Sequence, residues 1–249
     1  MSNAWMPAVR YVRTPDDGGP LKGGAPRVVW GVLGADPRTE SARSAAQRLD
    51  RAGRSSHLVW NPLHGEIVQL IPVVRAACSL SPSPELAARY GQPRPAAIPA
   101  INSEGRISVQ IRVVASAEEP FTDGPLARLA EIMAWLDSWG IPRIWPAGRP
   151  ASFPECHRSV RSRRLWARGG HFGESQVPGV SAVGPGAIDI ERLTGRSARA
   201  IPPPGAAGID PAGQPPAALP SRPHSYEPAG LGELHGDEMA RTAALARVR

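Results

Sequence analysis

The segment RVVWGVL at residues 27–33 constrains the fold of this chain more than any other. It is a continuous apolar run, rich in β-branched and aromatic residues, and Gly and Pro signals bound it. A strand with apolar side chains on both faces has to be covered on both faces. We therefore expect residues 27–33 to form the central strand of a sheet that lies between two layers.

Two amphipathic helices are predicted to supply those layers. Apolar residues recur at helical spacing in residues 41–53 and again in residues 122–140. Thr122 or Asp123 can cap the second helix, and Gly140 can end it. Both helices are expected to pack on the sheet.

Further segments predict the remaining strands. Residues 55–72 read as a hairpin, because the turn formers in NPLHG separate two apolar segments. Residues 106–115 alternate with the two-residue period of a half-buried strand, and the last strand is expected within residues 164–173. The polar face of the strand at 106–115 carries Ser108, Gln110 and Arg112. With a closing loop and short helix at 184–195, these elements predict an α/β fold with a mixed central sheet flanked by amphipathic helices.

Proline and glycine divide the chain into regions. It holds 29 Pro and 26 Gly among 249 residues, and much of the excess lies outside the periodic segments. We expect an irregular N-terminal arm at 1–24, a folded domain at 25–196 and a disordered tail at 197–249. A loop is predicted at 79–100, and within the tail only residues 236–248 have a weak helical pattern.

Composition excludes several classes of protein. The sequence has neither an apolar stretch long enough to span a bilayer nor the apolar core of a signal peptide. We therefore expect a protein that is cytoplasmic as synthesised and reaches a cell wall only through lysis or non-standard export. Cys78 and Cys156 cannot supply a disulfide framework. The net charge of +7 is almost entirely arginine, without a nucleic-acid-binding motif, so nucleic acid is not an expected partner. The oligomeric state is left open.

Several segments, in this order, resemble a known family. They are the strand RVVW, the hairpin HLVWNPLHGEIVQLIP, the segment VQIRVV after INSEG, the helix ending MAWLDSWGIP, and GGHFGESQVPGVSAVGPGAID. Over about residues 27–193 the chain resembles the zinc-dependent N-acetylmuramoyl-L-alanine amidases, which share a fold with peptidoglycan-recognition proteins and phage amidase-type lysozymes. The resemblance implies peptidoglycan or a muropeptide as ligand, and hydrolysis of the bond between N-acetylmuramic acid and L-alanine.

The family's zinc is held by two His and a third Asp, Cys or His, with an open position for water. The matching positions in this chain are Gly31, Glu174 and Gly184, and alignment on the Gly-His pair gives His171 in place of Glu174. Because glycine offers no ligand, the resemblance implies a zinc site too weak to stay occupied. Glu174 and Ser56 are the positions matched to catalytic residues, Ser56 standing where phage members often have tyrosine.

The expected function is therefore binding of peptidoglycan fragments by a catalytically impaired, amidase-like protein without a cofactor. Two alternatives stay open: an active zinc amidase whose metal site is rearranged around His171, Glu174 and possibly the Cys156–His157 pair, and a non-catalytic interaction scaffold. A cysteine nucleophile has no supporting signature.

Ligand contacts are expected from residues whose side chains suit a saccharide or a carboxylate. These are Trp60, Asn61, Arg112 and Trp166. For Trp60, Trp145 and Trp166, packing in the core or at a rim is the alternative to stacking on a sugar. The arginines between residues 158 and 168 are either an anion-binding surface or a solvated loop face.

Overall fold

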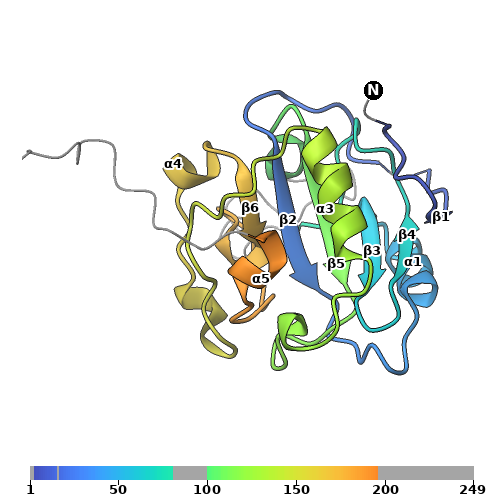
Figure 1. Cartoon of the computed structure of the whole chain (residues 1–249). Coiled ribbons are helices and arrows are strands. Elements are labelled where there is room, and N and C mark those ends of the chain that lie inside the picture. Colours follow the sequence, from blue (N-terminus) through green and yellow to red (C-terminus); the bar gives the residue numbers. More distant parts are fainter. Residues whose placement is uncertain (1–2, 16, 81–99, 196–249) are drawn as a thin grey trace, which may run out of the picture. The chain divides into compact units, whose positions relative to one another are not determined.

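The computed structural model describes residues 3–15, 17–80 and 100–195, which belong to one compact unit. They form a mixed α/β fold with a six-stranded sheet in the order β1-β4-β3-β5-β2-β6 (Figure 1). The strands are β1 (Arg10–Tyr11), β2 (Arg27–Val32), β3 (Leu58–Asn61), β4 (Glu66–Gln69), β5 (Ser108–Val113) and β6 (Gly170–Gly173). β3 and β4 form the predicted antiparallel hairpin, and every other neighbouring pair is parallel.

The expected buried strand is confirmed in β2. Its residues from Arg27 to Gly31 are all buried, and it lies between β5 and β6. Side chains alternate between the two faces, so Val28 and Trp30 join one apolar cluster while Val29 joins another. Burial on both faces is what the continuous apolar sequence requires.

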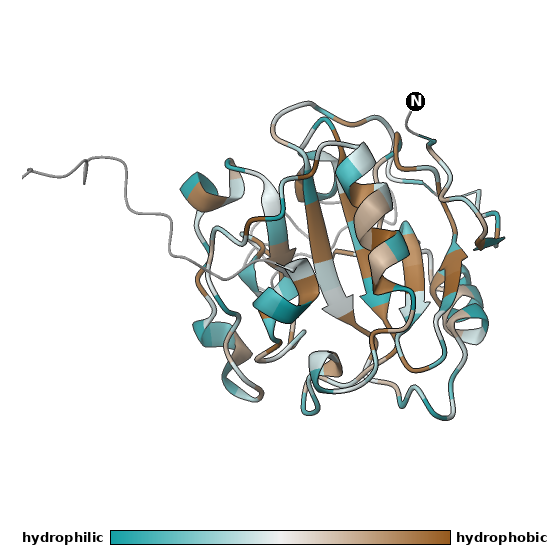
Figure 2. Ribbon diagram, viewed as in Figure 1, coloured by the Kyte–Doolittle hydropathy of each residue, from teal (hydrophilic) through white to brown (hydrophobic). Residues whose placement is uncertain are grey.

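Helices cover both faces of the sheet. The helix α3 (Leu129–Ser138) packs its apolar stripe on the face that carries Trp30 and Trp60, together with the short α5 (Ile190–Thr194). The helix α1 (Ala42–Arg51), capped by Ser41, packs on the opposite face against Val59 and Val68. In Figure 2 the strands are largely brown and the helices expose teal surfaces, as expected for a three-layer arrangement.

The helix predicted over 122–140 is shorter than its sequence pattern. Residues Phe121–Asp123 form a separate 3₁₀ turn, Arg128 has a left-handed backbone, and the α-helix begins only at Leu129. Thr122 does not cap α3, and its buried hydroxyl instead accepts a hydrogen bond from the N–H of Asp189 at 2.8 Å. The left-handed backbone at Arg128 separates the 3₁₀ turn from the α-helix, which Gly140 ends as predicted.

The strand β5 has the predicted alternation, but its polar face is not exposed. All six residues are buried. Gln110 accepts hydrogen bonds from the N–H and hydroxyl of Ser79 and donates to Asn102 at 2.8 Å. The segments on either side of residues 81–99 thus cover this face, and their polar groups satisfy the side chain of Gln110.

The remaining segments agree in part with expectation. Residues 164–173 contain the last strand, β6, but the short helix α4 (Arg163–Trp166) precedes it. The N-terminal arm contributes β1 to the sheet edge and buries Met6, whose N–H donates to Gln69 at 2.7 Å. Residues 81–99 of the predicted loop, the predicted tail after 196 and the helix at 236–248 lie outside the described residues. Within the described ranges, no helix is long and apolar enough to cross a bilayer.

Two histidines are fully buried and neutral. His57 Nδ1 accepts from the N–H of Gln110 at 2.9 Å, which leaves Nε2–H to donate to the carbonyl of Arg75. His171 stacks against Trp30, and its Nδ1 accepts from Trp30 Nε1 at 3.1 Å. In both rings, protonation of Nδ1 would replace this accepted hydrogen bond with two N–H groups that face each other. Burial lowers the pKa of His57 to about 4 and that of His171 to about 3.

These pKa values predict a loss of stability in acid. Between pH 6.5 and about 4 the unfolded chain binds protons at both histidines that the folded chain refuses, so the free energy of unfolding falls as the pH falls through that window. Urea denaturation at pH 7.5 and pH 5 should show this loss in the wild type. The difference between the two pH values should shrink by about half in His171→Phe, whatever that variant's stability at pH 7.5. An unchanged difference would contradict the assignment of His171.

Candidate functional site

A buried ion pair lies at the centre of the sheet face opposite α3. The Arg112 guanidinium donates to both carboxylate oxygens of Glu174, from Nη1 to Oε2 and from Nη2 to Oε1, the latter at 2.6 Å. The two side chains are 5% and 8% exposed. A bidentate pair of this kind holds both groups in one geometry and satisfies most of their hydrogen-bonding capacity.

Gly31 makes room for this pair. In the sheet register Gly31 of β2 lies beside Arg112 of β5. A Cβ on residue 31 would come within 2.6 Å of Glu174 Oε2 and closer still to Arg112 Nη1. Gly31 is not among the glycines with positive φ, so space rather than backbone conformation requires glycine here.

Two of the three positions matched to zinc ligands come together in the fold, because Gly31 lies directly against the Glu174 carboxylate. Gly184 instead lies against Val32, whose side chain packs on the opposite face of the sheet with Trp30. The carbonyl of Gly184 also accepts from the N–H of Ser175, the neighbour of Glu174, at 2.8 Å. Residues 31 and 174 are far apart in the sequence, and the sheet brings them together.

A second arginine borders the pair. The carbonyl of Ser79 accepts from Arg112 Nη2 and also from Arg54 Nη2, the latter at 3.3 Å. Burial and then the Arg112 charge lower the pKa of Arg54, while Glu174 raises it. Arg54 is an exposed residue, so this otherwise closed cluster has one cation that reaches solvent. The sequence pattern did not point to Arg54 or Ser79.

The residues present do not fit a zinc ion. Both oxygens of Glu174 are bonded to Arg112, and glycine at 31 and 184 supplies no side chain. The Arg112 guanidinium is a permanent cation beside Glu174, the only carboxylate among the three matched positions. A metal cation at this place would therefore be repelled by Arg112. Across the described ranges, no three His, Cys, Asp or Glu residues are grouped so that they could hold a metal.

The alternative ligands are not assembled either. His171 lies with Trp30 on one face of the sheet, whereas Glu174 contacts Gly31 on the other. Cys156 is buried and its thiol donates to the carbonyl of Val183, while its neighbour His157 is exposed. Burial raises the pKa of Cys156, which disfavours the thiolate.

Two tryptophans that were predicted to contact a ligand are instead core residues. Trp60 is fully buried between Trp30 and Phe121 and donates from Nε1 to the carbonyl of Ala127 at 3.0 Å. Trp166 is 2% exposed and stacks under the guanidinium of Arg27, 4.3 Å from the ring centroid. For both tryptophans, the packing alternative describes the structure, because a buried ring face cannot stack on a sugar.

Asn61 and Ser56 are also buried, in structural contacts. Ser56 donates from its hydroxyl to the carbonyl of Leu58. Asn61 donates to the carbonyls of Pro37 and Glu40 at 2.8 and 3.0 Å and accepts from the N–H of Leu63 at 3.0 Å. Asn61 therefore holds the loop after β2 against the β3–β4 turn.

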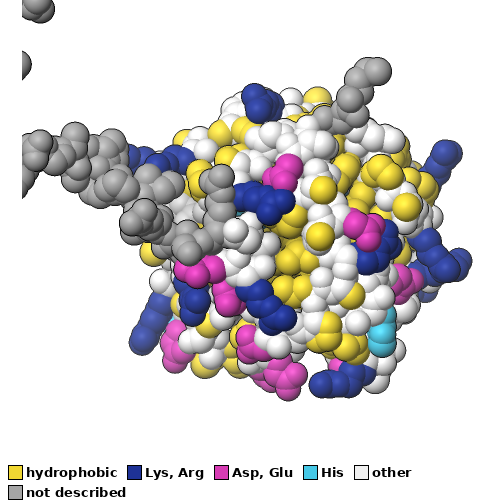
Figure 3. Space-filling model, viewed as in Figure 1, with side chains coloured by type: hydrophobic (Ala, Val, Ile, Leu, Met, Phe, Trp, Pro, Cys, Tyr) yellow, Lys and Arg dark blue, Asp and Glu magenta, His cyan; other side chains and the backbone are white. Residues whose placement is uncertain are grey.

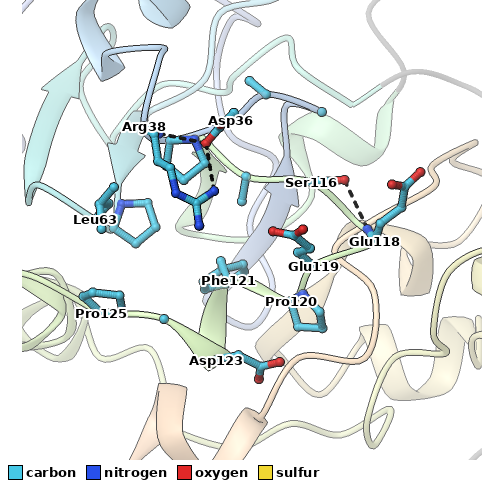
Figure 4. A pocket seen from close by; sticks show the side chains of 16 residues that line it. Asp36, Arg38, Leu63, Ser116, Glu118, Glu119, Pro120, Phe121, Asp123 and Pro125 are labelled. Atoms are coloured by element: carbon cyan, nitrogen blue, oxygen red, sulfur yellow. Dashed lines mark hydrogen bonds and ion pairs between the residues drawn. The ribbon is translucent and has the colours of Figure 1, made fainter.

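Those two loops border an open cavity of about 630 Å³. It lies outside the carboxyl ends of β2, β3 and β5, and its wall is completed by the segment after β5 (Figure 4). Apolar and acidic side chains both line it, and Arg38 is the only basic residue among them. The sequence carried one signal for it: the acidic segment AEEPFTDG at 117–124, directly after a strand in an arginine-rich chain.

Comparison of the chain with protein-family models, with curated proteins and with solved structures gives no match.

The close approach at Gly31 predicts that alanine is more destabilising at this position than at another glycine, Gly124. Gly31→Ala should lower the free energy of unfolding by about 3–5 kcal/mol, because its methyl group would force Arg112 and Glu174 apart. The matched control is Gly124→Ala, where φ is negative and the nearest atom to a new Cβ is 3.8 Å away. It should stay within about 1 kcal/mol of the wild type. Equal effects in urea denaturation would contradict the role given to Gly31.

The ion pair itself can be tested with a double-mutant cycle. Arg112→Met and Glu174→Met should each cost about 3–5 kcal/mol of stability, because each leaves an unpaired buried charge. The double variant should be more stable than either single variant, since it buries neither charge. Additive losses, measured by denaturation at pH 7.5, would show that the two side chains are not coupled in solution.

Proposed function

We propose that this protein recognises peptidoglycan fragments on an amidase-like scaffold without hydrolysing them. The observation that carries the proposal is the contact between Gly31 of β2 and Glu174, at the place where the Arg112 guanidinium lies against Glu174. The resemblance over residues 27–193 matched Gly31 and Glu174 to ligand positions from the sequence, and their proximity in the fold supports the proposal.

The same geometry argues for binding rather than catalysis. Amide hydrolysis in the resembled family needs a metal with an open coordination position. Here the carboxylate that remains is bonded at both oxygens, and the neighbouring cation has no lone pair with which to activate water. The residues keep a charged, preorganised cluster but supply no nucleophile or general base.

Arg54 is the residue through which the cluster would meet a ligand. It is exposed, it lies within hydrogen-bonding distance of the Ser79 carbonyl, and within the described ranges no carboxylate forms an ion pair with it. A guanidinium in that position suits the carboxylate of a muropeptide stem. Arg112, by contrast, is held inside the fold.

Titration with N-acetylmuramoyl-L-alanyl-D-isoglutamine tests this proposal. We expect saturable binding by calorimetry and no release of the peptide, even with equimolar zinc added. Arg54→Gln should weaken binding about tenfold, whereas Arg51→Gln, an exposed arginine at the end of α1, should leave it unchanged.

Two results would overturn the proposal. Peptide release that depends on stoichiometric zinc would show that the protein is an active amidase. If the protein is folded by circular dichroism but does not bind the muropeptide at millimolar concentration, the recognition proposal fails. The alternative of a non-catalytic interaction scaffold would then be favoured.

A further inference from the structure

The cavity of about 630 Å³ is separate from the Arg112–Glu174 cluster, and its residues have no part in the function proposed above. We infer that it is a binding site for a small organic cation, with an ammonium group joined to an apolar body. The inference rests on the cavity's place in the fold, its rigid frame and its unbalanced charge.

The cavity's place is the usual one for a ligand in an α/β sheet. β2 and β3 each run parallel to β5, so the three carboxyl ends point the same way. The cavity is lined by the residues that directly follow these ends, at 34–38, 62–63 and 115–125. Ligands of open α/β sheets bind in the crevice outside the carboxyl ends of the strands, and 630 Å³ is within the range of small-molecule sites.

The frame of the cavity is preformed. Four of its lining residues are prolines, whose φ angles are fixed by the ring: Pro37, Pro62, Pro120 and Pro125. The buried side chain of Asn61 joins two of the three loops through the carbonyl of Pro37 and the N–H of Leu63. A cavity held in this way does not have to be ordered when a ligand binds, so less binding energy is lost.

The lining determines the class of ligand. It contains four carboxylates, of Asp36, Glu118, Glu119 and Asp123, and one guanidinium, of Arg38. Arg38 is paired at 3.5 Å with Asp36. Among the described residues, no other basic residue lines the cavity to pair with Glu118, Glu119 and Asp123. In Figure 4 Leu63 and Pro125 lie on one side and Glu118, Glu119 and Ser116 on the other.

This acidic wall stands out in a chain whose net charge is +7. Figure 3 shows acidic side chains gathered at the lower edge of the molecule, over the segment that follows β5. A ligand that placed an ammonium group against Glu119, whose carboxylate points into the cavity in Figure 4, and its apolar body against Leu63 and the prolines, would satisfy both kinds of lining.

The test uses the peptide N-acetyl-Ala-Lys-Ala-amide, in which the lysine ε-ammonium is the only charge, and its Nε-acetyl derivative as the neutral match. Titration of the ¹⁵N-labelled full chain, followed by two-dimensional NMR, should shift the backbone signals of Gly34, Ser116 and Gly124 in a saturable way. The acetylated peptide should not produce these shifts.

Glu118→Gln/Glu119→Gln should weaken binding of the lysine peptide about tenfold. Asp50→Asn/Glu155→Gln removes the same charge from residues that do not line the cavity and should leave binding unchanged. The inference is overturned if the lysine peptide gives no shifts at about 10 mM, if the acetylated peptide binds equally well, or if the two double variants behave alike. Because the muropeptide test uses another site and another ligand, either proposal can fail without the other.

Discussion

The ion pair between Arg112 and Glu174 is the constraint on which one whole face of this sheet depends. A guanidinium and a carboxylate taken out of water are tolerated only with close geometry and full hydrogen bonding. That requirement accounts for glycine at position 31, where any side chain would occupy the space of the pair. It also accounts for the path of the chain at Ser79, whose carbonyl takes a further N–H of Arg112.

The same face shows how a sheet can be buried without being apolar. Apolar clusters lie on either side, one under α1 with Val59 and the other around Val29 and Phe172. Between them, β5 places polar side chains in a row, and each of Gln110 and Arg112 finds buried partners. An open cavity lies beyond the ends of the strands, between the loops after β2, β3 and β5.

The proposal of recognition rests on the geometry around Glu174. Gly31 and Glu174 lie together, and the cation beside them belongs to the side chain of Arg112. A permanent guanidinium can balance the charge of Glu174 and keep the fold closed, but it has no exchangeable coordination position. We therefore place recognition above hydrolysis among the functions proposed for this scaffold.

By itself, the sequence determined the elements whose signals are local. The apolar run of β2, the hairpin of β3 and β4, and the spacing of α1 and α5 each follow from a few neighbouring residues, and all were predicted from them. The start of α3 was not, because the periodicity of residues 122–140 does not show the left-handed backbone at Arg128 that precedes the helix. The burial of Arg112 could not be foreseen either, since alternation shows which residues share a face but not what covers it. Only the tertiary structure decided those features, because the partners of a buried charge and the walls of a cavity come from segments that the sequence keeps far apart.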